Sequence, residues 1–188
     1  MKTCTACGLP APSSTLACAL CAHPFPHQGP ASYRLESHAG GYRWLLDGEE
    51  LMTATWRGDS WELVDTESGR VAVTLIGMSQ EDGSRMAMVD HRRRAVATFI
   101  AAAEDDHGFG LVRDSYDHVL MGVRSDGPTG IHMVDTDGRV LAMASRPAPG
   151  RCVGMDLLMT RDGARRTQTI VLAVSLALEL LGQRQHVS

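Results

Sequence analysis

Four cysteines near the start of the chain have the residue type and spacing of a metal site. Cys4 and Cys7 form one CxxC pair, Cys18 and Cys21 form a second, and ten residues separate the pairs. Two intervening residues let both sulfurs of a pair point at one ion, and two such pairs complete a tetrahedron. Gly8 follows the first pair and can take the positive φ that such a tight turn needs. The pattern predicts a closed, structural zinc site with no position for a substrate water.

Other readings of these cysteines are a dithiol redox pair or an iron site. His23 and His27 could replace a cysteine as ligands, but four cysteines already complete the set, so we assign both histidines to a loop. The segment resembles the short zinc ribbons found at the ends of many prokaryotic proteins. We therefore expect a zinc ribbon over residues 1–23, a proline-rich linker over 24–30, and a second domain over 31–188.

A second candidate site involves arginine side chains. Arg161, Arg165 and Arg166 precede the last apolar stretch, and three consecutive arginines occupy positions 92–94 in a predicted turn. Planar guanidinium groups suit phosphate oxygens, so one hypothesis is a phosphate or lipid-headgroup site. The alternative is ordinary solvated turn charge, which is the more common state of such runs. The sequence leaves both readings open.

Composition limits the classes of function. The 188 residues include 18 basic and 22 acidic side chains, a formal net charge of -4, which argues against binding nucleic acid through bulk charge. No nucleophile elbow, phosphate-binding glycine loop or HExxH motif is present, so we do not expect an enzyme. The first residues lack the basic and apolar pattern of a signal peptide, and paired cysteines fit metal-bound thiolates in a reducing compartment. We therefore expect a cytoplasmic protein.

One pattern recurs five times between residues 42 and 145. A short apolar run ends at an aspartate, a few turn residues follow, and a second apolar run begins. Each unit predicts a β-hairpin, because aspartate favours the start of a turn and the runs are too short for helices. With single strands over 33–37 and 151–160, about twelve strands are expected, enough to close into an antiparallel barrel. The five turn residues are Asp47, Asp65, Asp90, Asp114 and Asp135.

The last apolar stretch, residues 170–181, predicts a helix that is aliphatic almost all round. Only Ser175 and Glu179 are polar, and we expect them to face a barrel mouth or a hydrogen-bonding partner. A membrane span is the rival reading, but twelve apolar residues are too few to cross a bilayer and Glu179 would be costly there. We therefore place a helix over 165–182 inside the barrel, buried on all sides.

These features resemble the tubby C-terminal-like superfamily, in particular its LURP-one-related and phospholipid-scramblase-like branches. The resemblance rests on the strand–Asp–turn units, above all Asp-Thr-Asp-Gly-Arg-Val at 135–140, and on the terminal strand and helix, over roughly residues 31–188. It implies a closed barrel of twelve strands around a central hydrophobic helix. Several members bind phosphoinositides or are linked to membrane lipid. The acidic calcium segment of the scramblases has no counterpart here, and no lipid site can be transferred position by position.

We therefore expect a mainly β, non-catalytic binding protein that is cytoplasmic or peripheral at a membrane. Its expected ligand is a phosphoinositide or other anionic lipid headgroup, with Arg161, Arg165 and Arg166 as candidate residues, or a protein partner bound through the zinc ribbon. The alternative is a nucleic-acid or transcription-linked adaptor acting through the ribbon. That segment carries one lysine and no arginine, which is a poor electrostatic match to nucleic acid.

Overall fold

The computed structural model describes residues 2–3, 7–8, 10–11, 20, 30–80, 83–101, 108–126, 130–145, 154–159 and 165–185. The chain divides into two compact units, Met1–Pro30 and Ala31–Ser188. In the first unit, β1 (Lys2–Thr3) pairs antiparallel with β2 (Pro10–Ala11). Gly8 lies between them with φ of 73°, which confirms the expected positive φ.

The zinc site remains a prediction. Cys4, Cys18 and Cys21 lie outside the described residues, and of the four cysteines only Cys7 is described, as an exposed residue. No group of three or more possible metal ligands occurs among the described residues.

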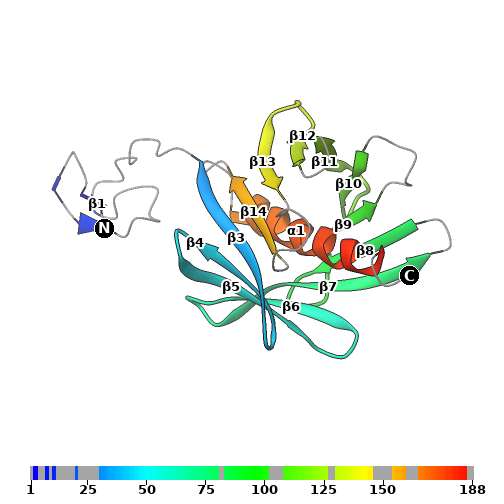
Figure 1. The fold of residues 1–188 in the computed structure, drawn as a ribbon, viewed down its shortest axis with the longest axis horizontal. Helices are drawn as coiled ribbons and strands as arrows, with labels where there is room; N and C mark the ends of the chain where they lie inside the picture. Colours follow the sequence, from blue (N-terminus) through cyan, green and yellow to red (C-terminus); the bar gives the residue numbers. More distant parts are fainter. Residues whose placement is uncertain are drawn as a thin grey trace. The chain divides into compact units, whose positions relative to one another are not determined.

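Twelve strands within the described part of the second unit close into one antiparallel barrel, as predicted (Figure 1). Each strand pairs with the next in sequence, and the last pairs with the first. All five predicted hairpins form. The first strand is longer than the predicted 33–37, and within the predicted 151–160 the described residues 154–159 form the last strand, while the others lie outside the described residues. The strands are β3 (Ala31–His38), β4 (Gly41–Leu46), β5 (Glu49–Trp56), β6 (Ser60–Asp65), β7 (Arg70–Gln80), β8 (Gly83–Val89), β9 (Ala95–Ala101), β10 (Gly108–Asp114), β11 (Val119–Asp126), β12 (Gly130–Asp135), β13 (Val140–Ser145) and β14 (Gly154–Met159).

The helix found among the described residues, α1 (Arg165–Gln185), lies inside the ring of strands (Figure 1). Every residue from Ile170 to Leu178 is at most 4% exposed, so the helix is enclosed on all sides, as the sequence predicts. It ends at Gln185 instead of residue 182. Arg165 and Arg166 form its first turn, so the predicted start at residue 165 is confirmed. Within the described residues, no helix is long and apolar enough to cross a membrane.

The two polar residues of the helix are both buried. Ser175 is fully buried, and its hydroxyl accepts a hydrogen bond from the indole Nε1 of Trp44 (3.2 Å) and donates one to the carbonyl of Leu172 (2.7 Å). Trp44 belongs to β4, so this contact fixes the helix against the barrel wall. Glu179 is 8% exposed. Of the two expected surroundings, Ser175 therefore has a hydrogen-bonding partner in the core and does not face a mouth.

The repeated aspartates are explained by the turns that they start. In three turns the aspartate Oδ1 accepts hydrogen bonds from the backbone N–H groups two and four residues later, at 2.8–2.9 Å. The residue three positions after the aspartate has a positive φ, between 58° and 80°. The aspartate carboxylate thus gives the backbone N–H groups of its own turn a hydrogen-bond acceptor. These turns follow Asp90, Asp114 and Asp135.

All five aspartate turns lie at the same end of the barrel, because alternate connections of an up-and-down barrel share an end. The helix also begins at this end, since β14 ends at Met159 beside Ala31 and the chain then enters α1. We call this end the proximal mouth and the opposite end the distal mouth. The proximal mouth therefore combines the start of a helix with five polar turns.

Candidate functional site

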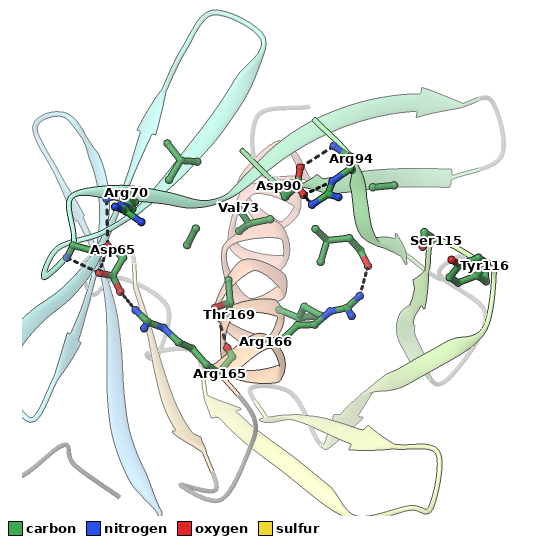
Figure 2. A pocket seen from close by; sticks show the side chains of 16 residues that line it. Asp65, Arg70, Val73, Asp90, Arg94, Ser115, Tyr116, Arg165, Arg166 and Thr169 are labelled. Carbon is green, nitrogen blue, oxygen red and sulfur yellow. Dashed lines mark hydrogen bonds and ion pairs between the residues drawn. The ribbon is translucent and has the colours of Figure 1, made fainter. Parts of the chain in front are cut away.

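A cleft of about 930 Å³ opens at the proximal mouth, between the first turns of α1 and the adjoining ends of β7 and β9 (Figure 2). Thr169 and Ile170 of the helix form part of its floor. Four arginines and two aspartates line it, which leaves a formal surplus of two positive charges. The charged residues are Asp65, Arg70, Asp90, Arg94, Arg165 and Arg166.

One side of the cleft is built by an ion pair between the helix and the β6–β7 turn. The Arg165 Nη2 donates to Asp65 Oδ2 at 2.7 Å, while Asp65 Oδ1 accepts from the backbone N–H (2.8 Å) and hydroxyl (2.7 Å) of Ser68. The Ser68 hydroxyl lowers the pKa of Asp65 most, and the Ser68 N–H and Arg165 lower it further against the opposing effect of burial. Asp65 is only 12% exposed and Arg165 is 79% exposed. The carboxylate therefore anchors one edge of a guanidinium that otherwise faces the cleft.

The other side is built by the β8–β9 turn. Arg94 donates from Nε to Asp90 Oδ2 at 2.8 Å, and its Nη2 forms an ion pair with the same oxygen at 2.7 Å. Asp90 Oδ1 accepts the backbone N–H groups of Arg92 and Arg94. The pKa of Asp90 falls to about 2, first because of the Arg94 N–H and then because of its guanidinium. Asp90 is thus a permanent anion at neutral pH, and it holds the Arg94 side chain in a fixed direction.

The two remaining arginines are less constrained. Arg166 donates from Nη2 to the carbonyl of Val96 at 3.3 Å, which draws it toward the β9 side of the cleft (Figure 2). The Arg70 guanidinium makes no hydrogen bond or ion pair with another described residue, although its backbone N–H bonds the Ser68 hydroxyl. Both side chains therefore keep N–H donors for a ligand.

The helix start strengthens the positive potential. A helix N-terminus carries partial positive charge and unpaired N–H groups, and acidic residues normally occupy it. The first turn of α1 has no acidic residue and instead has Arg165 and Arg166. Among the described residues, Asp65 from another element is the acidic residue that offsets one of them, Arg165. Such a site attracts anions, and arginine forks are well shaped for phosphate or carboxylate oxygens.

The polar groups in the described lining of the cleft are mainly hydrogen-bond donors. Its described lining includes no histidine or cysteine, and both carboxylates are occupied by turn N–H groups and guanidinium groups. The arrangement supplies hydrogen-bond donors and positive charge to an anion.

The structure brings together residues that the sequence analysis treated separately. Arg165 and Arg166 both line the cleft, whereas Arg161 lies outside the described residues. Arg94, from the predicted arginine turn, lies in the same cleft. Sequence reasoning missed Arg70. Arg70 could have been found from its position directly after the predicted β6–β7 turn, because that turn and the start of the helix lie at the same end of the barrel.

Comparison with known proteins supports the fold only. The sequence matches no protein-family model, and it matches no curated protein. An X-ray structure of a protein from Arabidopsis thaliana is similar, with a TM-score of 0.57 and 15% sequence identity over 81% of this chain and 91% of that chain. At this identity the similarity shows a shared fold, and it assigns no ligand or activity.

Proposed function

We propose that this protein is a non-catalytic binding protein of the tubby-like barrel class, and that its proximal mouth binds the phosphate-bearing headgroup of a membrane lipid. The observation that carries the proposal is the meeting of four arginines in one open cleft with only two carboxylates. The sequence resemblance to tubby-like and scramblase-like proteins supports the choice of lipid as the source of the phosphate.

The contacts within the cleft favour a bound anion over internal charge pairing. Asp65 and Asp90 each hold one guanidinium by one oxygen and use the other oxygen for their own turns. Arg70 and Arg166 have no carboxylate partner among the described residues. A phosphate group carries negative charge and can accept several N–H hydrogen bonds at once. It would therefore neutralise the positive charge of these two arginines, which water cannot do.

We further propose that the N-terminal unit is a structural zinc ribbon held by Cys4, Cys7, Cys18 and Cys21. Four thiolates leave no open coordination position, so the ion would stabilise the unit and present it to a protein partner. Lysine at position 2 is its only basic residue apart from histidine, which gives little support to a nucleic-acid contact.

Vesicle flotation tests the lipid function. The full chain should float with phosphatidylcholine vesicles that contain phosphoinositides and should not float with phosphatidylcholine alone. Arg70→Ala and Arg166→Ala should each weaken binding by about fivefold, since one cation near an anionic surface contributes about 1 kcal/mol. Raised salt should weaken binding further by screening.

Arg139→Ala is the matched control. Arg139 lies in an aspartate turn of the same mouth, between β12 and β13, but it does not line the cleft. Because Arg139 lies at the same mouth but outside the cleft, its substitution should weaken flotation less than Arg70→Ala or Arg166→Ala does. Failure of the wild-type protein to bind, or an equal loss from Arg139→Ala, would show that the cleft is not a headgroup site.

A further inference from the structure

Tyr116 is an exposed aromatic side chain at the edge of the cleft. It lies in the β10–β11 turn, lines the cleft, and is 80% exposed (Figure 2). Its backbone is fixed, because its N–H donates to Asp114 Oδ1 at 2.8 Å. Its ring has one aromatic neighbour, His118, at a centroid distance of 6.3 Å. The turn therefore presents a large apolar ring, with a polar tip, to the outside of the barrel.

The neighbouring turn presents two arginines. β9 pairs with β10, so the β8–β9 and β10–β11 turns lie side by side at the proximal mouth. Arg92 and Arg93 are exposed in the β8–β9 turn, and neither side chain makes a hydrogen bond or ion pair with another described residue. Asp90, the acidic residue of this turn, is already paired with Arg94. The turn thus carries two unneutralised cations.

The acidic residues of the β10–β11 turn are also occupied. Asp117 accepts an ion pair from Arg113 at 2.8 Å, and Asp114 accepts the N–H groups of Tyr116 and His118. These internal partners reduce the repulsion that the two carboxylates would exert on an anionic surface. The β10–β11 turn can therefore approach an anionic surface although it contains two aspartates.

The charge around the mouth is uneven. The β4–β5 turn lies half-way round the ring of strands from the β10–β11 turn and carries Asp47 and Glu49 with no basic residue. An anionic surface would repel that side and attract the side of Arg92 and Arg93. Of these two sides of the mouth, the side with the β8–β9 and β10–β11 turns is therefore the more complementary to anionic lipid.

We propose that the β8–β9 and β10–β11 turns form a membrane-docking edge, in which Tyr116 enters the interfacial region of an anionic bilayer and Arg92 and Arg93 contact lipid phosphates. The inference rests on the proposed headgroup function and adds the orientation of the barrel on the membrane. Tyrosine suits this position because its ring favours the apolar side of the interface and its hydroxyl the wet side. The barrel then docks tilted, with the β4–β5 turn away from the lipid.

Fluorescence quenching tests the orientation in the full chain. The variant Tyr116→Trp is mixed with vesicles of phosphatidylcholine, phosphatidylglycerol and phosphoinositide whose acyl chains carry bromine. The introduced indole should be quenched and its emission should shift to shorter wavelength. The wild-type chain is the control, because Trp44 is fully buried and Trp56 and Trp61 flank the β5–β6 turn at the distal mouth. Its fluorescence should not change.

Affinity measurements complete the test. Tyr116→Ala should weaken vesicle binding by about tenfold through lost ring burial. Arg92→Ala combined with Arg93→Asn should weaken vesicle binding by about 25-fold, at about fivefold per cation. Asparagine is chosen at position 93 because it tolerates the φ of 58° found there.

The outcomes separate the two proposals. If soluble inositol phosphate binds but the introduced indole is not quenched, the headgroup site stands and the docking edge is wrong. If neither the soluble headgroup nor the vesicles bind, both proposals fall. Quenching of the wild-type chain would place the distal mouth on the membrane and would overturn the orientation.

Discussion

Ser175→Ala tests whether the central helix is held in register by the buried contact to Trp44. The substitution removes the only acceptor that the structure gives the Trp44 indole N–H, in a region where both side chains are fully buried. An unsatisfied buried donor costs about 1 to 3 kcal/mol, and the change in volume is small. For a unit of this size the melting temperature should fall by between about 2 and 12 °C.

Thermal unfolding followed by circular dichroism measures the effect, and Thr169→Ala is the matched control. Thr169 lies on the same helix and its hydroxyl also donates to a helix carbonyl, that of Arg165 at 3.0 Å, but its site is partly exposed. Its removal leaves no buried donor without an acceptor. The control should therefore change the free energy of unfolding by no more than about 0.5 kcal/mol.

A double-mutant cycle with Trp44→Phe isolates the hydrogen bond. Phenylalanine has no N–H, so Ser175→Ala should be less costly in that background, by about 1 kcal/mol or more. Equal costs in both backgrounds would mean that the two side chains do not interact. The assigned register of α1 against β4 would then be wrong.

Three further predictions concern a close approach, a turn and the metal. Gly110→Ala should destabilise the barrel by about 1 to 3 kcal/mol, because Gly110 has φ of 146° and an added Cβ would overlap the carbonyl oxygen of Ile100. Gly122→Ala, whose Cβ would make only an ordinary contact at 3.5 Å, should be nearly neutral, and equal chemical-denaturation midpoints for the two variants would contradict this reasoning. The pKa of Asp90 lies at about 2 in the folded protein and at 3.8 without its partners, so its contribution to stability is complete above pH 3.8 and is lost as the pH falls toward 2. Asp90→Asn should lack this part of the acid sensitivity, and a denaturation series across that range should reveal a shallower slope than for wild type. Metal analysis should find about one zinc per chain, which Cys4→Ser with Cys7→Ser should abolish; an undiminished content would refute the four-cysteine site.

Much of the barrel could be predicted because the residues that specify each hairpin lie close together in the sequence. Each hairpin has its own apolar runs and its own aspartate, and the aspartate bonds N–H groups only two and four residues away. The strand count therefore followed from counting units. The strand ends were less certain, because pairing with neighbours extends a strand beyond its apolar run, as for β3 (Ala31–His38).

The sequence by itself determined that the last helix must be enclosed by protein. The helix is aliphatic on almost every side, and such a surface is not stable when it is exposed to water. The sequence also determined the hairpins and the metal-ligand pattern of the cysteines. Only the tertiary structure decided which groups meet. Trp44 and Ser175 are 131 residues apart, and Asp65 and Arg165 are 100 apart. Such contacts depend on closure of the barrel and on the rotation of α1 within it, and no local pattern encodes either one.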